Sequence, residues 1–156
     1  MTIYNLKRPP LLGLCLLFSC FFFISATWKD NQPSMILQFN ELESQRGQIC
    51  VAVYKCEQTF MQPDAHIRAE IYTLDEFNGT IKLQNLPYGQ YAIAVFQDLN
   101  GNEKLDTNVF GVPKEPYGFS NNLRVKWRKP RFDEAQVRFA KDGQVVPVQL
   151  LTWQKQ

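Results

Sequence analysis

Alternation of apolar and polar positions is the dominant pattern of the chain beyond its N-terminal segment. In FNGTIKL (77–83) every second residue belongs to one face, and the residues between them are more polar. Successive strand side chains point to opposite faces, so this period of two predicts strands with one buried face. HIRAEIYT (66–73) and AQVRF (135–139) show the same period. In the former, the pattern predicts that Ala69 and Ile71 face the core.

Two further stretches are apolar on both faces, QICVAVY (48–54) and YAIAVF (91–96). Strands of this kind are typical of the middle of a sheet. SMILQF (34–39) and QVVPVQLL (144–151) bring the number of expected strands to about seven. Pro147 removes a backbone donor, which predicts that the last strand lies at an edge.

About seven short strands, with Gly and Pro in the turns and no helical stripe, predict an all-β fold. We expect an antiparallel β-sandwich of the immunoglobulin or transthyretin (prealbumin) type. LRVKWRKPR (123–131) also alternates and predicts a strand with a cationic outer face. That face could rest on an anionic lipid or polysaccharide surface, or it could be a solvated edge strand protected by its charges.

The N-terminal segment has the pattern of a secretory signal peptide. Lys7 and Arg8 precede an uncharged apolar run at 11–24, and small residues follow it. The run of about 14 residues is shorter than the roughly 20 that a membrane-spanning helix needs. We therefore predict a signal peptide at 1–26 and a single exported domain at 27–156, periplasmic or extracellular, with no transmembrane span in the mature chain.

Two other fates of this segment stay open, an uncleaved anchor and a lipid anchor. LFSC places Leu and Ser before Cys20 as a lipidation site would require. Phe18 is too bulky for its position in such a site, and the apolar run continues beyond Cys20. These features favour cleavage after residue 26 over acylation.

Removal of 1–26 changes the charge balance of the protein. Lys7 and Arg8 carry the whole formal net charge of +2, which leaves 15 basic and 15 acidic residues in the mature chain. Binding to nucleic acid depends on a strong positive field. The sequence therefore argues against a nucleic-acid partner, while an envelope protein or a polysaccharide remains compatible with it.

Cys50 and Cys56 are the cysteines of the mature chain. An extended run would hold their Cα atoms about 20 Å apart, far beyond the reach of a disulfide. We expect two separate small apolar side chains rather than a bridge.

The polar stretch DLNGNEKLDTN (98–108) has the oxygen donors of a calcium loop at alternate positions. The candidate ligands are the side chains of Asp98, Asn100, Asn102 and Asp106 and the backbone carbonyl of Lys104. An ion-free loop, in which Asp and Asn side chains bond to their own backbone, uses the same residues. Both interpretations stay open.

FGVPKEPYGFSNN (110–122) is rich in Pro and Gly and predicts a loop. Tyr117 and Phe119, beside Asn121 and Asn122, could grip a sugar or a peptide. The alternative is that both rings fold back and close one end of the sandwich.

The sequence gives little support for a catalytic function. His66 is the single histidine, and we find no nucleophile elbow and no Gly-rich phosphate loop. Our first hypothesis is a non-enzymatic exported module, weakly stabilised by Ca²⁺ if the loop binds it, that acts in binding or at the cell envelope. The alternative is a small transthyretin-like or hydrolytic enzyme that uses the loops at one end.

Two motifs carry a resemblance to known families. LPYGQY (86–91), followed by a strand, resembles a turn of transthyretin-like sandwiches. YAIAVFQDLNGNEKLDTNVFGVPKEPYGFSNN (91–122) resembles the bacterial exported family catalogued as domain of unknown function 2141. The matching residues are Asp98, Asn100, Asn102, Leu105, Asp106, Asn108, Gly111, Pro113, Glu115, Tyr117, Gly118, Phe119, Ser120, Asn121 and Asn122.

The resemblance implies an exported β-sandwich with no established reaction. It also implies Gly at the position of Glu103, which is the sixth position of the loop. An EF-hand requires Gly there as well and an acid at the twelfth position, where this chain has Val109. These two departures predict that any calcium affinity is weak.

Overall fold

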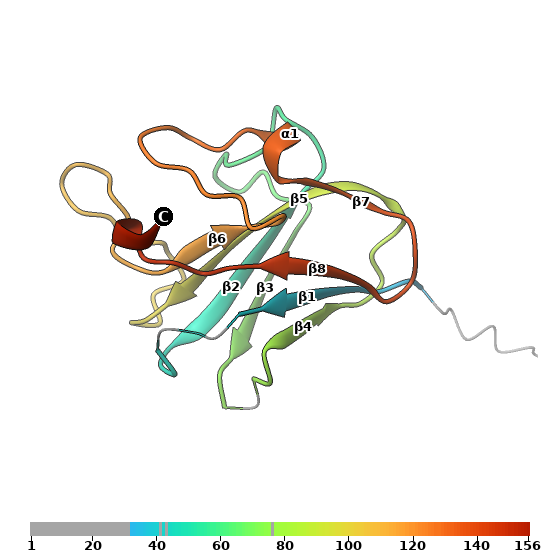
Figure 1. Cartoon of the computed structure of the whole chain (residues 1–156), viewed down its shortest axis with the longest axis horizontal. Coiled ribbons are helices and arrows are strands. Elements are labelled where there is room, and N and C mark those ends of the chain that lie inside the picture. The colour runs from blue at the N-terminus through green and yellow to red at the C-terminus, as the bar shows by residue number, and fades with distance from the viewer. Residues whose placement is uncertain (1–31, 41, 43, 76) are drawn as a thin grey trace, which may run out of the picture. The chain divides into compact units, whose positions relative to one another are not determined.

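The computed structural model describes residues 32–156 apart from positions 41, 43 and 76, and this part of the chain folds into strands that form two sheets (Figure 1). The predicted signal peptide and Cys20 lie outside the described residues. The elements are β1 (Met35–Phe39), β2 (Gln48–Tyr54), β3 (Arg68–Thr73), β4 (Thr80–Leu83), β5 (Gly89–Asp98), β6 (Tyr117–Phe119), α1 (Phe132–Ala135), β7 (Gln136–Phe139), β8 (Gln144–Val148) and the 3₁₀ turn η1 (Trp153–Lys155).

One sheet has the order β4-β1-β8, and the other has the order β3-β2-β5-β6 with β7 also paired to β5. This arrangement confirms the all-β sandwich. It also places β2 and β5 in the middle of a sheet and β8 at an edge, as their patterns predicted. The pairing of β1 with β8 is parallel, whereas the other strand pairings are antiparallel.

The main core lies between the two sheets. It contains Met35 and Leu37 of β1, Val51 of β2 and Ile93 of β5, all at most 3 % exposed. Every second residue of each strand points into this layer, and this is why apolar residues recur with a period of two in the sequence. Burial of these aliphatic side chains is the main driving force for folding, at about 25 cal/mol per Å² of apolar surface removed from water.

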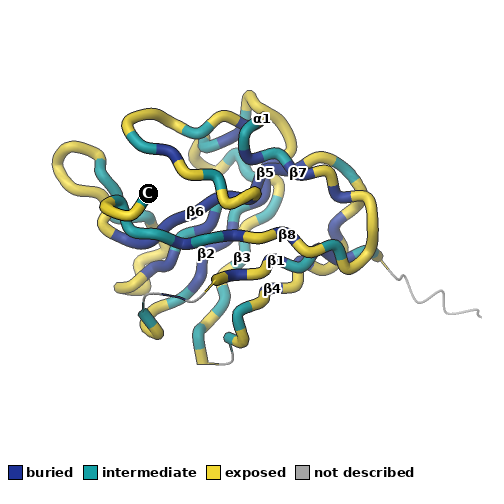
Figure 2. Tube along the Cα trace, in the orientation of Figure 1, coloured by how far each residue is buried: buried dark blue, intermediate teal, exposed yellow. Residues whose placement is uncertain are grey.

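A second apolar cluster covers part of the outer face of the larger sheet. Phe60 comes from the connection between β2 and β3, Val125 from the segment between β6 and α1, and Phe132 from the start of α1. All three pack near Tyr54 and Phe119. Phe60 contacts the rings of Tyr54, Phe119 and Phe132 edge to face, at centroid distances of 5.3, 6.3 and 5.9 Å. Figure 2 shows the buried backbone of β5 and β6 beneath these connections. Strands β2 and β5 are therefore apolar on both faces because both faces are covered.

Strand β3 presents the face opposite to the one predicted from the sequence. Ala69 is exposed and Ile71 is 45 % exposed, whereas Tyr72 packs against the main core. The reason is register, because Ala69 pairs with Ala52 and Ile71 pairs with Cys50, and both partners lie on the outer face. At this edge of the sheet, Arg68 and Tyr72 bond to Glu70.

The prediction of a strand at 123–131 is wrong. This segment is an irregular loop in which Trp127 has a φ of 66° and is 84 % exposed. Its arginines at 128 and 131 bond to acidic side chains of α1, and Arg124 and Lys126 bond to the C-terminal segment, so these charges line no sheet face. Conversely, Tyr117–Phe119 forms strand β6, where the sequence predicted only a loop, because it pairs with β5 over three residues.

Candidate functional site

Three alanines lie side by side on the outer face of the larger sheet. Ala69 of β3 pairs with Ala52 of β2, and Ala52 pairs with Ala94 of β5. Phe119 of β6 continues the same row next to Ala94. Neighbouring strands are about 4.8 Å apart, so three methyl side chains in a row leave a shallow trough about 10 Å wide.

Loops deepen this trough into a cleft with a volume of about 960 Å³. One wall is formed by 103–113, a second by 61–66, and a third by 125–130 with Trp153. Its size lies at the upper end of the range for small-molecule sites, and its walls carry several apolar side chains, as such sites do. The cleft is therefore a built concave site over an apolar floor.

The next row of the floor contains Ile71, Cys50, Phe96 and Tyr117, paired across the four strands in that order. Burial and the nearby negative charges of Asp98 and other acids raise the pKa of the Cys50 thiol to about 12. The thiol is the inactive form of this nucleophile. Cys50 therefore serves the floor as an apolar surface rather than as a reactive group.

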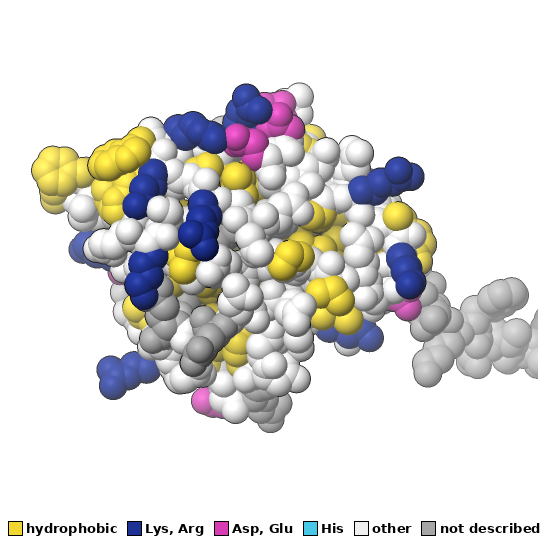
Figure 3. All heavy atoms as spheres, in the orientation of Figure 1, with side chains coloured by type: hydrophobic (Ala, Val, Ile, Leu, Met, Phe, Trp, Pro, Cys, Tyr) yellow, Lys and Arg dark blue, Asp and Glu magenta, His cyan; other side chains and the backbone are white. Residues whose placement is uncertain are grey.

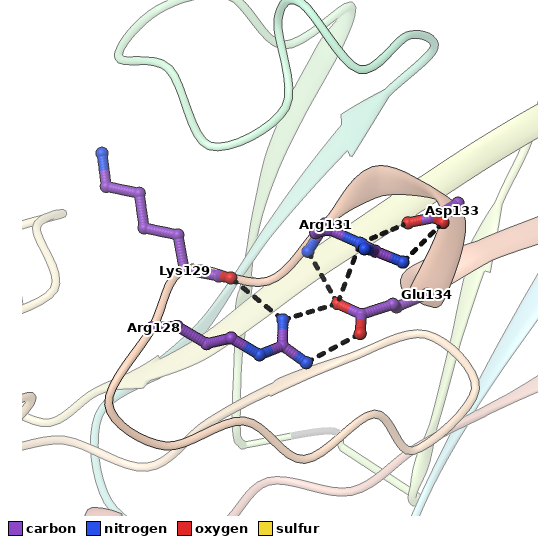
Figure 4. Close-up of polar contacts among 5 residues, drawn as sticks. All are labelled: Arg128, Lys129, Arg131, Asp133 and Glu134. Carbon is purple, nitrogen blue, oxygen red and sulfur yellow. Dashed lines mark hydrogen bonds and ion pairs between the residues drawn. The ribbon is translucent and has the colours of Figure 1, made fainter.

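The cations beside the cleft differ in whether an ion pair holds their side chains. Arg128 donates two hydrogen bonds of 2.7 Å to the carboxylate of Glu134, and Arg131 bonds to Asp133 (Figure 4). The Arg128 hydrogen bonds, with the Arg131 backbone N–H, lower the pKa of Glu134 to about 2. The side chain of Lys129 extends away from this cluster and has no ion pair within the described part of the chain.

The predicted calcium loop follows β5 directly and is built around Asp98, which is fully buried. One carboxylate oxygen accepts backbone N–H groups at 2.7 to 3.3 Å, and the other accepts the Glu103 N–H at 2.7 Å and the Gln48 amide at 3.0 Å. Burial acts to raise the pKa of Asp98. The hydrogen bonds from Glu103, Gln48, Gly101 and Asn100 outweigh it and hold that pKa below its ordinary value.

The other candidate ligands bond to one another. Asn100 and Asn102 donate their side-chain amides to the two oxygens of Asp106, at 2.7 and 3.2 Å. The side-chain oxygen of Asn102 accepts the backbone N–H of Lys104 at 2.8 Å. The last of these is an Asx-type bond of the ion-free interpretation. Among the residues the structure describes, no cluster of three or more His, Cys, Asp or Glu is placed to hold a metal. Calcium binding stays a prediction.

The backbone conformation of Glu103 explains why the family resemblance implied Gly at this position. Its φ is 61°, in the left-handed region that Gly adopts at little cost. Glu115 then fixes the far side of the loop, because its buried carboxylate accepts the backbone N–H groups of Leu99 and Asp106. The loop is thus held by two buried carboxylates, of which sequence reasoning identified Asp98 alone.

The four residues predicted to form a binding loop lie in two different environments in the fold. Tyr117 and Phe119 are 6 % and 3 % exposed on β6, where both rings join the outer cluster and line the cleft. Asn121 and Asn122 form an exposed turn with positive φ, and Asn121 donates to the Gln136 carbonyl at 2.8 Å. Cys50 and Cys56 are free thiols.

Sequence reasoning missed the alanine row. Its one visible signal was that two strands, 48–54 and 91–96, are apolar on both faces with Ala at outward positions. The row itself depends on the pairing register, which places Ala52 between Ala69 and Ala94. No local pattern encodes that alignment.

No helix of the described chain has the length and apolar character needed to cross a membrane. Searches of curated proteins and of solved structures each found no match. A family model, described as "Uncharacterized protein conserved in bacteria (DUF2141)", matches residues 37–146. This range contains six of the eight strands whole, parts of β1 and β8, the aligned alanines and the Asp98 loop. The chain belongs to this bacterial family of uncharacterized proteins.

Proposed function

We propose that this protein is an exported, non-enzymatic binding module that holds an apolar or amphipathic small molecule in the cleft over the larger sheet. The observation that carries the proposal is the alanine row, Ala69, Ala52 and Ala94, which leaves an apolar trough that the loops enclose. The protonated Cys50 thiol in the floor supports binding over covalent chemistry. The signal pattern at 1–26 supports export.

The cleft would bind through contact area rather than through many polar bonds. Ile71 and Phe96 of the floor remain partly exposed, so a ligand would remove their surface from water. Each Å² of apolar surface buried contributes about 25 cal/mol. Lys129 at the rim favours a ligand whose polar end is anionic.

Filling the trough should abolish binding. Ala69→Trp places an indole in the cleft from an exposed position on an edge strand, where an aromatic residue is compatible with the fold. We expect the mature protein to enhance the fluorescence of dansyl-undecanoic acid on binding. We expect Ala69→Trp to weaken that binding about tenfold or more.

Thr73→Trp is the matched control, since Thr73 is exposed on the same strand and does not line the cleft. It should bind the dye as the original protein does. Equal loss in both variants, or no dye binding by the original protein, would contradict the proposal. Thermal melting of both variants separates loss of binding from loss of fold.

A further inference from the structure

We propose that the loops around the cleft mouth form a docking surface for an anionic lipid bilayer. The proposal goes beyond the binding function, because it names the surface on which the protein works. Three apolar side chains project from two of these loops: Val109 is 93 % exposed, Phe110 is 87 % exposed and Trp127 is 84 % exposed. Phe110 and Trp127 both line the cleft, so the two loops flank one mouth.

The first loop presents its apolar tip on an ordered turn. The side-chain oxygen of Asn108 accepts the backbone N–H groups of Phe110 and Val112 at 2.9 and 3.0 Å. The backbone N–H of Asn108 donates to the Val112 carbonyl at 2.8 Å. A turn fixed in this way loses little conformational freedom on docking. It also keeps Val109 and Phe110 from folding back onto the protein.

The second loop presents a tryptophan. Trp127 contacts the ring of Trp153 edge to face at 5.3 Å, yet most of its surface stays in water. Trp prefers the boundary between water and lipid, where its ring is buried and its N–H finds a polar partner. Single exposed apolar residues are ordinary, but three nearly bare ones around one mouth indicate an interaction site.

Charge favours an anionic partner. Segment 99–131 contains seven basic residues, Lys104, Lys114, Arg124, Lys126, Arg128, Lys129 and Arg131, and three acidic residues, Glu103, Asp106 and Glu115. Its net charge is therefore +4, while the rest of 27–156, with eight basic and twelve acidic residues, has a net charge of −4. Of the seven cations, only Arg128 and Arg131 have ion pairs within the described chain.

Figure 3 shows the same combination on the surface, with hydrophobic side chains gathered at one end of this face and Lys and Arg side chains close beside them. Figure 1 places the loop that carries Val109 and Phe110 at that end. Apolar tips that insert and cations that meet lipid headgroups are the two components of interfacial membrane binding. This pairing distinguishes a bilayer from a purely polar anionic surface.

The test is binding of the mature protein to vesicles that contain phosphatidylglycerol and to vesicles of phosphatidylcholine alone. We expect binding to the anionic vesicles, weaker binding at high salt, and a blue shift of tryptophan fluorescence. Val109→Ser with Phe110→Ser should weaken binding about tenfold or more, since the pair of changes removes two of the three exposed apolar side chains. Lys129→Glu should weaken it as well.

Val145→Ser is the control, because Val145 is 51 % exposed on the other sheet. It should bind vesicles as the original protein does. Val109 does not line the cleft. Val109→Asp should therefore weaken vesicle binding and leave dye binding intact, whereas Ala69→Trp should do the opposite. The two proposals can thus fail separately.

Equal binding to both kinds of vesicle at low salt would overturn the inference. So would anionic binding that the tip variants leave unchanged. Retention on dextran sulfate without binding to anionic vesicles would replace the bilayer by a polysaccharide and would also overturn it. Val109 and Phe110 are nearly fully exposed, and Lys129 and Val145 are exposed as well, so unchanged melting is expected and excludes unfolding as the cause.

Discussion

Two buried carboxylates hold the polar loop after β5 in place. Asp98 has no exposed surface and accepts bonds from four backbone N–H groups and one amide, and Glu115 accepts two more backbone N–H groups. Each bond to an ionised carboxylate contributes more than a bond between neutral groups. These hydrogen bonds therefore stabilise the loop, whose composition is that of a cation site.

Asp98→Asn should destabilise the protein at neutral pH by about 2 kcal/mol, since the amide cannot accept the same set of donors. The folded-state pKa of Asp98 lies below its ordinary value, so its contribution is present above the unfolded pKa of about 4. That contribution is lost as pH falls through the folded pKa. Urea unfolding of both proteins should show a difference at pH 7 that shrinks below about pH 4.

The same loop allows a test of calcium. Because the carboxylate of Asp98 already accepts five hydrogen bonds, the ion-free interpretation predicts that millimolar calcium leaves the melting temperature of the mature protein unchanged. A rise in melting temperature that Asp98→Asn removes would instead establish a site, because a ligand of the native state stabilises it by mass action. In the urea experiment, the original protein and Asp98→Asn should differ less in unfolding free energy at low pH. A difference that stays constant down to pH 3 would contradict the role given to Asp98.

Strand β6 shows how an element can be invisible in the sequence. It has three residues, and its pairing with β5 and its contact with the segment after β8 define it. A Cβ added to Gly118 would lie 2.1 Å from the Gln149 carbonyl oxygen, so glycine is required for the close approach of two backbones. The same contact holds the C-terminal segment beside the cleft.

Gly118→Ala should destabilise the fold by about 2 kcal/mol or more, because neither backbone can move without breaking its hydrogen bonds. Gly89→Ala is the matched control, since the nearest atom to its added Cβ is the Tyr91 hydroxyl at 3.2 Å. Gly89 also lies in a strand, but its added Cβ would meet a side chain at 3.2 Å and not a backbone oxygen at 2.1 Å. The melting temperatures of the two variants should be measured against the original protein. Equal decreases in melting temperature would contradict the packing argument.

At the scale of the whole molecule, charge and apolar surface are unevenly distributed although the mature chain is neutral. The +4 segment 99–131 carries the two loop tips that flank the cleft mouth. A neutral total therefore does not exclude a surface that attracts anions, because the field near a surface depends on local charges. The cations that the sequence predicted on a strand face at 123–131 lie instead on an irregular loop.

Export is predicted from the pattern at 1–26, and it would directly support the proposed envelope function. When the full chain is expressed in a bacterium, we expect the purified protein to begin at Thr27, after cleavage following Ala26. Intact-mass measurement checks this. A protein that retains residues 1–26, or one that begins at an acylated Cys20, would contradict the predicted signal peptide and would give the module a membrane anchor.

The amino-acid sequence by itself determined seven of the eight strands of the described chain, which of them are central and the polar loop that follows β5. These depend on local periodicity and composition, which a chain carries wherever it folds. Tertiary structure alone decided the outward face of β3, the existence of β6, the loop at 123–131 and the cleft. Each of these results from register or packing between distant segments: Ala69, Ala52 and Ala94 become one surface only after three strands align.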